Sequence, residues 1–131
     1  MAKLPYDLVS PERKLASGEA DAIQIPGAEG DLTAMPEHAP FLTPLRPGVV
    51  TVRDGGSETS YVVTGGFAEI SPAGAAVLAE EAVKKEDVSS EWVSARLADA
   101  EKAHEIATGD AKTLAALRLN DLKFLASSLG F

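Results

Sequence analysis

The sequence has no cysteine among its 131 residues. Disulfide bonds, thiolate nucleophiles and cysteine-based zinc sites are therefore excluded. No apolar run approaches the length of about 20 residues that a membrane-spanning helix needs, so we expect no such helix. The first residues lack the long apolar core of a signal peptide and the arginine content of a transit peptide. The chain is therefore expected to act in the compartment where it is made.

Positive charge is also scarce, with 12 lysines and arginines against 20 aspartates and glutamates and a net charge of −8. Basic residues never cluster beyond a pair, as at Arg13–Lys14 and Lys84–Lys85. A surface of this sign repels nucleic acid and anionic lipid. We therefore expect no nucleic-acid binding and no direct membrane insertion. The charge favours a protein partner with basic patches.

The first part of the chain, residues 1–86, has the pattern of a β domain. Short segments rich in β-branched and apolar residues are separated by glycine- and proline-containing turns about every 8–12 residues. These segments are AIQI (22–25), VVTV (49–52), SYVVT (60–64) and AAVLA (75–79). Asp54-Gly55-Gly56 is predicted to form a hairpin turn, because glycine adopts positive φ readily. The pattern predicts an antiparallel sandwich or barrel.

The second part, residues 87–131, contains no proline and has helical periodicity. Ser89 or Ser90 can cap a first helix, and Thr108-Gly109-Asp110 can end it and begin a second. Residues spaced by three and four then form one apolar seam, which Leu114 and Leu125 widen. The seam consists of Val93, Leu97, Ala100, His104, Ala107, Ala115, Leu119, Leu122, Ala126 and Leu129. This predicts an antiparallel two-helix hairpin. Its alanine-rich seam buries little area, so we expect it to be the less stable domain.

His38, one of two histidines, is the first candidate for chemistry. A catalytic or metal-binding histidine needs a nucleophile, an orienting carboxylate or further ligands nearby. Glu37 is adjacent, but no nucleophile motif accompanies it, and His104 lies in the helical part. A structural or interface role for His38 and a packing role for His104 are favoured. We therefore predict no catalytic residue, no metal ligand and no cofactor.

Gly65 and Gly66 follow the segment SYVVT, as the glycines of a phosphate-binding loop would. Such a loop continues with Gly-Lys-Ser/Thr, whereas this chain returns to strand alternation in Phe67–Ile70. A tight turn or bulge where chain segments approach closely is therefore favoured.

Three carboxylates, Glu29, Asp31 and Glu37, lie within nine residues. Their spacing differs from that of a calcium loop, which leaves a solvated acidic loop or a contact surface for a basic partner. Prolines 36, 40, 44 and 47 lie within and beyond this segment. Proline fixes φ and cannot donate to a sheet ladder. We therefore expect a stiff, extended connector that presents Phe41, Leu42 and Leu45 at the surface.

These segments resemble the epsilon subunit of F-type ATP synthases, the equivalent of the mitochondrial delta subunit. The resemblance is carried by PGAEGDLTAMPEHAPFLTPLRPGVV, by the GGFAEIS turn and by AAVLAEEAV, and it is most specific over residues 22–82. It implies a β-sandwich of about ten strands in residues 1–86 and a helical hairpin in 87–131. It also implies a non-catalytic rotor subunit of the central stalk, which couples proton-driven rotation to ATP synthesis. Such a subunit is peripheral, on the cytoplasmic face of the bacterial inner membrane, and the lack of a transit peptide favours a bacterium.

The resemblance also implies contacts. By similarity, Glu29, Gly30 and Asp31 face the polar loops of the ring of c subunits. The gamma subunit would contact a second segment, which consists of His38, Ala39, Pro40, Phe41 and Leu42. In some bacterial members the hairpin contacts the alpha and beta subunits and inhibits ATP hydrolysis.

Some members also bind ATP through a motif [IL]-D-x-x-R-A at the start of the first helix. In this chain Ser89, Trp92 and Val93 replace the acid, the arginine and the alanine. This departure from the motif predicts no nucleotide binding. Residues 87–131 also hold five basic against seven acidic residues, which predicts weak or absent inhibition by the hairpin. The alternative, a chiefly regulatory subunit whose helices inhibit hydrolysis or sense ATP, stays open. A β-sandwich enzyme would need a nucleophile and a base that the sequence does not show.

Overall fold

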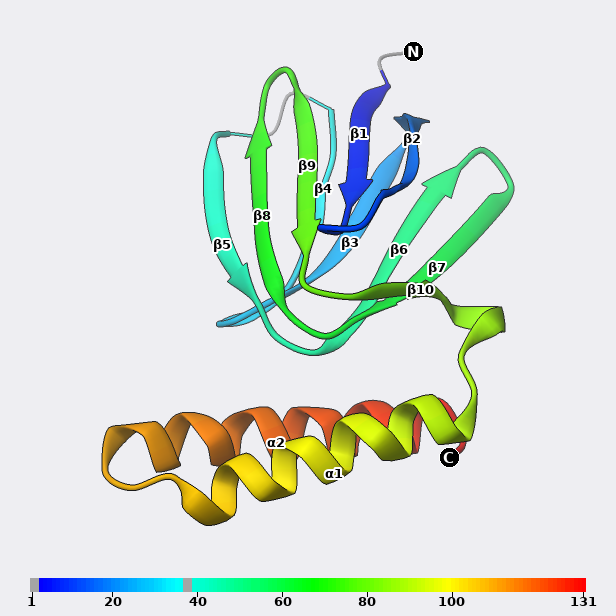
Figure 1. The fold of residues 1–131 in the computed structure, drawn as a ribbon. Helices are drawn as coiled ribbons and strands as arrows, with labels where there is room; N and C mark the ends of the chain where they lie inside the picture. The colour runs from blue at the N-terminus through cyan, green and yellow to red at the C-terminus, as the bar shows by residue number, and fades with distance from the viewer. Residues whose placement is uncertain (1–2, 37–38) are drawn as a thin grey trace. The chain divides into compact units, whose positions relative to one another are not determined.

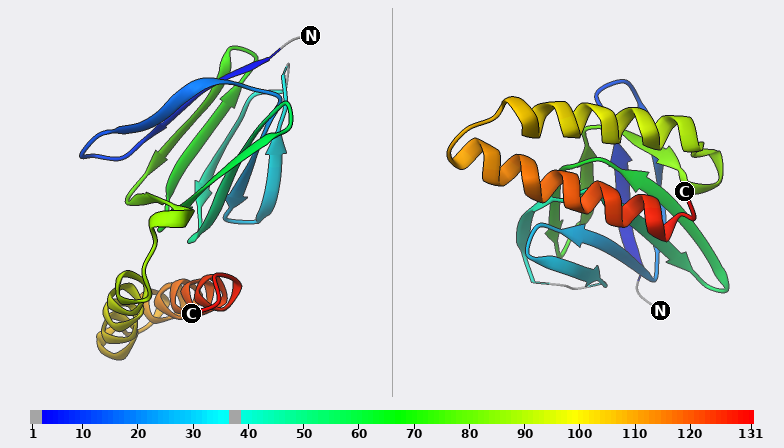
Figure 2. Two further views of the ribbon diagram at one scale, coloured as in Figure 1. Left: turned by 90° about the vertical axis from the view of Figure 1, so that its right-hand side faces the viewer. Right: turned by 90° about the horizontal axis from the view of Figure 1, so that it is seen from below.

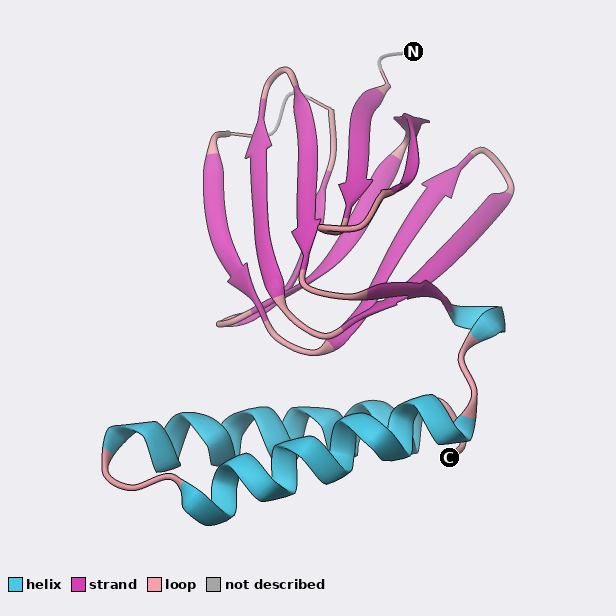
Figure 3. Cartoon of the chain, viewed as in Figure 1, coloured by secondary structure: helices cyan, strands magenta, loops and turns pink. Residues whose placement is uncertain are grey.

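The computed structural model describes residues 3–36 and 39–131 (Figure 1). The chain divides into two compact units, one ending at Lys85 and the other running from Glu86 to Phe131. The first consists of β-strands and the second of helices (Figure 3). The predicted fold class, a β-sandwich followed by a helical hairpin, is confirmed.

The first unit contains ten strands in one continuous sheet, which folds over into two layers (Figure 2). They are β1 (Leu4–Val9), β2 (Lys14–Ala20), β3 (Ala22–Gly27), β4 (Gly30–Ala34), β5 (Phe41–Leu45), β6 (Gly48–Asp54), β7 (Ser57–Val63), β8 (Gly66–Ser71), β9 (Gly74–Ala79) and β10 (Ala82–Lys84). One layer has the order β2-β1-β9-β8-β5 and the other β4-β3-β6-β7-β10. The pair β1–β9 is parallel, whereas the other pairings described are antiparallel.

The core lies between the two layers because alternate side chains of each strand point to opposite faces. In β8, Ala68 and Ile70 are buried while Phe67 is 54% exposed. Burial of an aliphatic side chain stabilises the fold by about 1.5–3 kcal/mol. The largest fully buried side chains of this core are those of Leu4, Leu8, Ile23, Ile25, Val50, Val63, Ile70 and Val77.

The four strand segments named from the sequence fall in β3, β6, β7 and β9, although Thr64 of the third segment lies just beyond the end of β7. The predicted hairpin is also present, since Asp54 pairs with Ser57 and Gly55 has a φ of 61°. At Gly66 the prediction of a close approach is confirmed. A Cβ atom there would lie 2.0 Å from the carbonyl oxygen of Leu78.

The proline-rich segment differs from the predicted connector, because Phe41–Leu45 forms strand β5 and pairs with β8. Pro44 is tolerated inside this strand for a geometric reason. Its carbonyl oxygen accepts a hydrogen bond from the Ala28 N–H at 2.9 Å, so its ring nitrogen also faces the β3 side. The absence of a backbone N–H on Pro44 therefore removes no hydrogen bond between β5 and β8. Leu45, expected at the surface, is buried.

A 3-10 turn (Lys85–Asp87) spans the border between the units, and the second unit continues with α1 (Ser90–Ile106) and α2 (Asp110–Ser128). Ser89 is the cap of α1, and its Oγ accepts from the Trp92 N–H at 3.1 Å. The seam prediction is confirmed for the buried residues Val93, Ala100, Leu119, Leu122, Leu125 and Ala126. Leu114 is a correction: it is 67% exposed, because the seam near the helical turn is formed by the half-buried Ala107 and Ala115.

Candidate protein interaction surfaces

The first candidate surface is built on the turn between β3 and β4. Gly27 pairs with Gly30, which leaves Ala28 and Glu29 at the tip. A Cβ atom on Gly27 would lie 2.7 Å from the carbonyl oxygen of Gly30, so the tight turn requires glycine there. Glu29, Gly30 and Asp31 are all exposed. The structure thus brings these three predicted contact residues together on one turn, whereas Glu37 lies outside the described residues.

A second turn lies beside the first because β3 and β5 meet at the pair Gly27–Leu45. The Arg46 N–H donates to the Pro26 carbonyl at 3.0 Å, and the Ala28 N–H donates to the Pro44 carbonyl at 2.9 Å. The two prolines therefore contribute only carbonyl oxygens to this joint, where they need no N–H. The Arg46 side chain closes over the joint, with its Nη2 2.8 Å from Asp31 Oδ1.

The β9–β10 turn adds charge at the same end of the sandwich. The Glu80 N–H donates to the Gly65 carbonyl at 2.9 Å, and the Thr64 N–H donates to the Glu81 carbonyl at 3.2 Å. We call these turns together the turn-end surface. It comprises the exposed and half-buried residues 28–31, 46 and 80–81, with four carboxylates and one arginine.

The second candidate surface lies on the outside of the β5-β8-β9 layer. Pro44 pairs with Phe67, and Phe67 pairs with Leu78, so the three side chains form one row across the layer. Leu42 lies on the same face, two residues from Pro44. Leu42 is 66% exposed, and Phe67 and Leu78 are 54% exposed each. We call Leu42, Phe67 and Leu78 the outer apolar face; large exposed apolar clusters commonly mark contact surfaces.

An apolar groove of about 380 Å³ borders this face. It is lined by Val9, Ser10, Pro11, Gly66, Phe67, Leu78, Ala79 and Glu80. Of the predicted gamma-contact residues, Phe41 and Leu42 start β5 and are exposed, as are Ala39 and Pro40 before it. His38 lies outside the described residues. Sequence reasoning missed Phe67 and Leu78, although the alternation in FAEIS predicts that Phe67 and Glu69 share the outer face.

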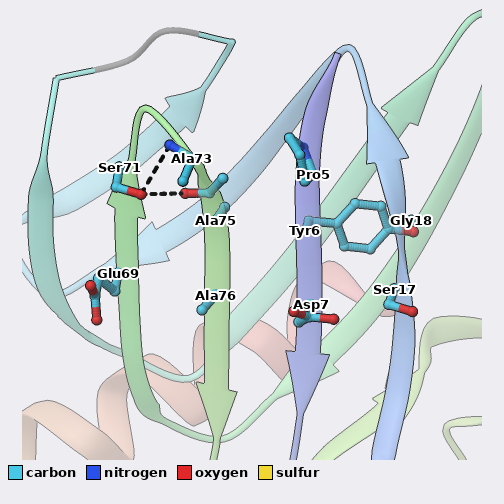
Figure 4. A pocket seen from close by; sticks show the side chains of 11 residues that line it. Pro5, Tyr6, Asp7, Ser17, Gly18, Glu69, Ser71, Ala73, Ala75 and Ala76 are labelled. Atoms are coloured by element: carbon cyan, nitrogen blue, oxygen red, sulfur yellow. Dashed lines mark hydrogen bonds between the residues drawn. The ribbon is translucent and has the colours of Figure 1, made fainter.

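A second groove, of about 430 Å³, lies over β8, β9, β1 and β2 (Figure 4). Its floor is made of small residues such as Gly74, Ala75 and Ala76. The Tyr6 ring extends towards Gly18, and burial raises the pKa of its phenol. The charged residues of its lining are Asp7 and Glu69, and Asp7 is paired with Lys14 at 3.2 Å.

At the start of α1, the three positions that the resemblance compares with a nucleotide motif take part in packing and capping. The Ser89 hydroxyl caps the helix, the Trp92 ring lies under the Arg96 guanidinium at 4.5 Å, and Val93 is buried. These contacts give each substituted position a structural role within the hairpin.

The described residues contain no group of three or more acidic or histidine side chains arranged to hold a metal ion. Among the helices described, none is both long and apolar enough to cross a membrane.

Comparison with known proteins identifies the family. The model described as "ATP synthase, Delta/Epsilon chain, beta-sandwich domain" matches residues 3–85. The "ATP synthase epsilon chain" of Jannaschia sp. is 49% identical over 122 residues, which cover 93% of this chain and 92% of that one. The protein of the same name from Caulobacter vibrioides is 54% identical over 84 residues, which cover 64% of this chain but 98% of that one.

A chain in the cryo-EM structure of the Euglena gracilis mitochondrial ATP synthase has the same fold. Its TM-score is 0.76 at 23% identity, and the match covers 98% of this chain and 82% of that one. The family model covers more than half of this chain, and the Jannaschia relative covers nearly all of it. The chain therefore belongs to the delta/epsilon chain family of ATP synthases.

Proposed function

We propose that this chain is a non-catalytic rotor subunit of a proton-translocating ATP synthase. It binds the gamma subunit and the ring of c subunits and couples proton-driven rotation to ATP synthesis. One observation carries the proposal: in a family member, a single β unit presents two surfaces of different chemistry. A part that transmits rotation must hold two neighbours at once, and two distinct surfaces allow this.

The turn-end surface suits the c-ring. Its four carboxylates and one arginine give it negative charge, which attracts basic loops and speeds their encounter. The joint between β3 and β5 fixes the two turns through backbone hydrogen bonds. A fixed turn loses little conformational entropy when it docks.

The outer apolar face suits the gamma subunit. Leu42, Phe67 and Leu78 provide an apolar centre, and Glu69 and Glu80 lie at its edge. An apolar centre with a polar rim is the usual anatomy of a protein interface. The predicted contact residues Ala39, Pro40 and Phe41 precede or begin the strand that forms one border of this face. On this proposal the protein is peripheral, on the cytoplasmic face of a bacterial inner membrane, and needs no cofactor.

The test is reconstitution of the cognate ATP synthase from which this subunit has been removed. The purified chain is added back, and proton-driven ATP synthesis is measured beside three variants. We expect full-length protein and residues 1–86 to restore synthesis. Asp31→Lys and the double variant Phe67→Ser, Leu78→Ser should fail, each through a different surface. Ile106→Ser, at an exposed apolar position at the end of α1 outside both surfaces, is the control.

A failure of the wild-type chain to bind or to restore synthesis would overturn the proposal. Restoration by all variants would leave the two surfaces without the assigned roles.

The alternative, a chiefly regulatory subunit, has one observation in its favour. On α2, Leu114, Leu117 and Phe124 form an exposed apolar strip of large side chains. Such a strip can bind the alpha and beta subunits. If the hairpin inhibits, removing residues 87–131 will strongly activate ATP hydrolysis by the intact enzyme; we expect little activation, because this segment holds five basic against seven acidic residues.

A further inference from the structure

We propose that Arg46 is a positioning residue for Asp31, and that their ion pair unites the β3–β4 and β5–β6 turns into one contact element whose free acid is Glu29. This inference rests on the proposed function, because it concerns how the turn-end surface meets the c-ring. On this inference Asp31 does not bind the c-ring directly. It pairs with Arg46 inside the subunit instead.

The geometry favours an internal role for Asp31. Arg46 Nη2 lies 2.8 Å from Asp31 Oδ1, and both side chains are partly exposed. An exposed ion pair is often weak, because two long side chains must be ordered to make it. Here the backbone does much of the ordering, since the turns that carry the two residues are already joined by the Ala28–Pro44 and Arg46–Pro26 hydrogen bonds.

The net negative charge is therefore distributed unequally over the two turns. Glu29 lies at the tip of its turn and is exposed, while the charge of Asp31 is offset by Arg46. The three residues carry a net charge of −1, and it is concentrated at Glu29. The partner loop that fits this arrangement has a basic side chain for Glu29. Beside it, the partner needs a hydrogen-bond acceptor for the remaining donors of Arg46.

The inference predicts that the pair matters more than the sign of either member. Exchanging the charges, as Asp31→Arg with Arg46→Asp, keeps both the pair and the net charge. Arg46→Gln breaks the pair and leaves two uncompensated acids on the turns. Arg46→Gln should weaken docking because the two turns lose the ion pair that positions them for the partner, and this loss should outweigh the added attraction of a more negative surface for basic loops. It should also make docking more sensitive to salt, because the surface becomes more negative.

The experiment uses the intact, subunit-depleted ATP synthase and titrates each variant to half-maximal restoration of ATP synthesis at several salt concentrations. We expect Arg46→Gln to raise the half-restoration concentration by up to about fivefold and to steepen its salt dependence. Arg46→Lys should recover part of the loss, and the exchanged double variant should return to within about twofold of wild type. Arg53→Gln is the matched control, because Arg53 makes an equally exposed pair with Glu58 at 3.0 Å, outside the turn-end surface.

Thermal unfolding of every variant separates docking from folding, since a merely structural pair would lower the unfolding temperature of Arg46→Gln without raising the half-restoration concentration. The inference is overturned if Arg46→Gln behaves like Arg53→Gln, or if the exchanged variant is no better than Arg46→Asp alone. If the wild-type chain itself fails to restore synthesis, the proposed function fails as well, so the two failures are distinguishable.

Discussion

Gly66 lies where three strands meet, because it pairs with Leu45 of β5 and with Ala79 of β9. Its φ is 128°, a conformation that residues with a side chain rarely adopt. The space is also closed, since a Cβ atom would lie 2.0 Å from the Leu78 carbonyl oxygen. Both constraints act on the edge of the outer apolar face, so this glycine positions Phe67 and Leu78.

We predict that Gly66→Ala lowers the free energy of unfolding by at least about 2 kcal/mol, through backbone strain and displacement of β9. Urea unfolding of the full chain, followed by the circular dichroism of the sheet, measures this. Gly56→Ala is the control, because nothing lies within 4 Å of the added atom. We expect it to stay within about 0.5 kcal/mol of wild type, and equal effects at the two positions would contradict the prediction.

Lys3 ties the start of the chain to the turn after β2 and to the β6–β7 hairpin. Its Nζ lies 2.8 Å from Asp21 Oδ1 and 2.6 Å from Asp54 Oδ1. The hydrogen bond from Lys3, with a second from the Gly55 N–H, holds the pKa of the Asp21 carboxyl below its ordinary value. The same acids raise the pKa of Lys3.

Because the folded pKa of Asp21 lies below the unfolded value of about 3.9, its contribution to stability is present above that pH. It is lost as the pH falls through the folded pKa. We therefore predict that Asp21→Asn destabilises the protein at pH 7 and reduces the loss of stability between pH 5 and pH 2. Urea midpoints across this range, with Glu12→Gln as an exposed control, test it. An unchanged pH profile in Asp21→Asn would contradict a stabilising role for the contacts of Asp21 with Lys3 and the Gly55 N–H.

The positions of the strands were easier to predict than which side chains of each strand are exposed. Glycine turns and β-branched runs identified β3, β6, β7 and β9 from local sequence alone. β5 was missed because Pro44 excludes a ladder donor, and only the tertiary arrangement shows that this donor is not needed. In the same way, the exposure of Phe67 and Leu78 depends on the pairing of β8 and β9, which directs both side chains away from the sandwich core.

The hairpin seam was largely predictable because helical spacing is a local property. Leu122 is 1% exposed, whereas Leu117 on the same helix is 56% exposed. We predict that Leu122→Ala costs about 2–4 kcal/mol and unfolds the hairpin, while Leu117→Ala changes its stability by less than about 0.5 kcal/mol. Hydrogen exchange of residues 90–128 measures the difference. It also tests the expectation that the hairpin is less protected than the sandwich.

The start of α1 leads to a prediction about nucleotides. Ser89 is occupied as a cap, and Trp92 stands where the motif has an arginine to bind phosphate. Calorimetric titration with ATP and Mg²⁺ should show no saturable binding below about 1 mM. Residues 1–86, which lack this segment, serve as the reference. A micromolar affinity that is lost in the reference would revive the nucleotide-sensing alternative.

For the whole molecule, each unit buries its own apolar residues. The core cluster of the first unit is made only of residues between Leu4 and Ala82, while the second buries residues from Val93 to Ala126. We predict that residues 1–86 fold alone, with the circular dichroism of a β protein and one cooperative urea transition. A fragment that is unfolded or aggregated at neutral pH would show that the sandwich needs the helices.

The candidate surfaces could be predicted only in part. The family resemblance groups Glu29, Gly30 and Asp31 as one contact, and the structure has them on one turn. The sequence does not pair Asp31 with Arg46, since the two residues are 15 positions apart and meet only where β3 joins β5. Contacts that depend on how distant strands are arranged cannot be derived from local periodicity.

The border between Lys85 and Glu86 has a genetic consequence. A single stop codon introduced just after it would leave all ten strands and both proposed surfaces encoded. The Caulobacter vibrioides relative, matched over 84 residues that make up 98% of its length, has about the size of such a product. A single mutation can therefore remove the hairpin from the encoded protein and leave the sequence of the β-sandwich unchanged.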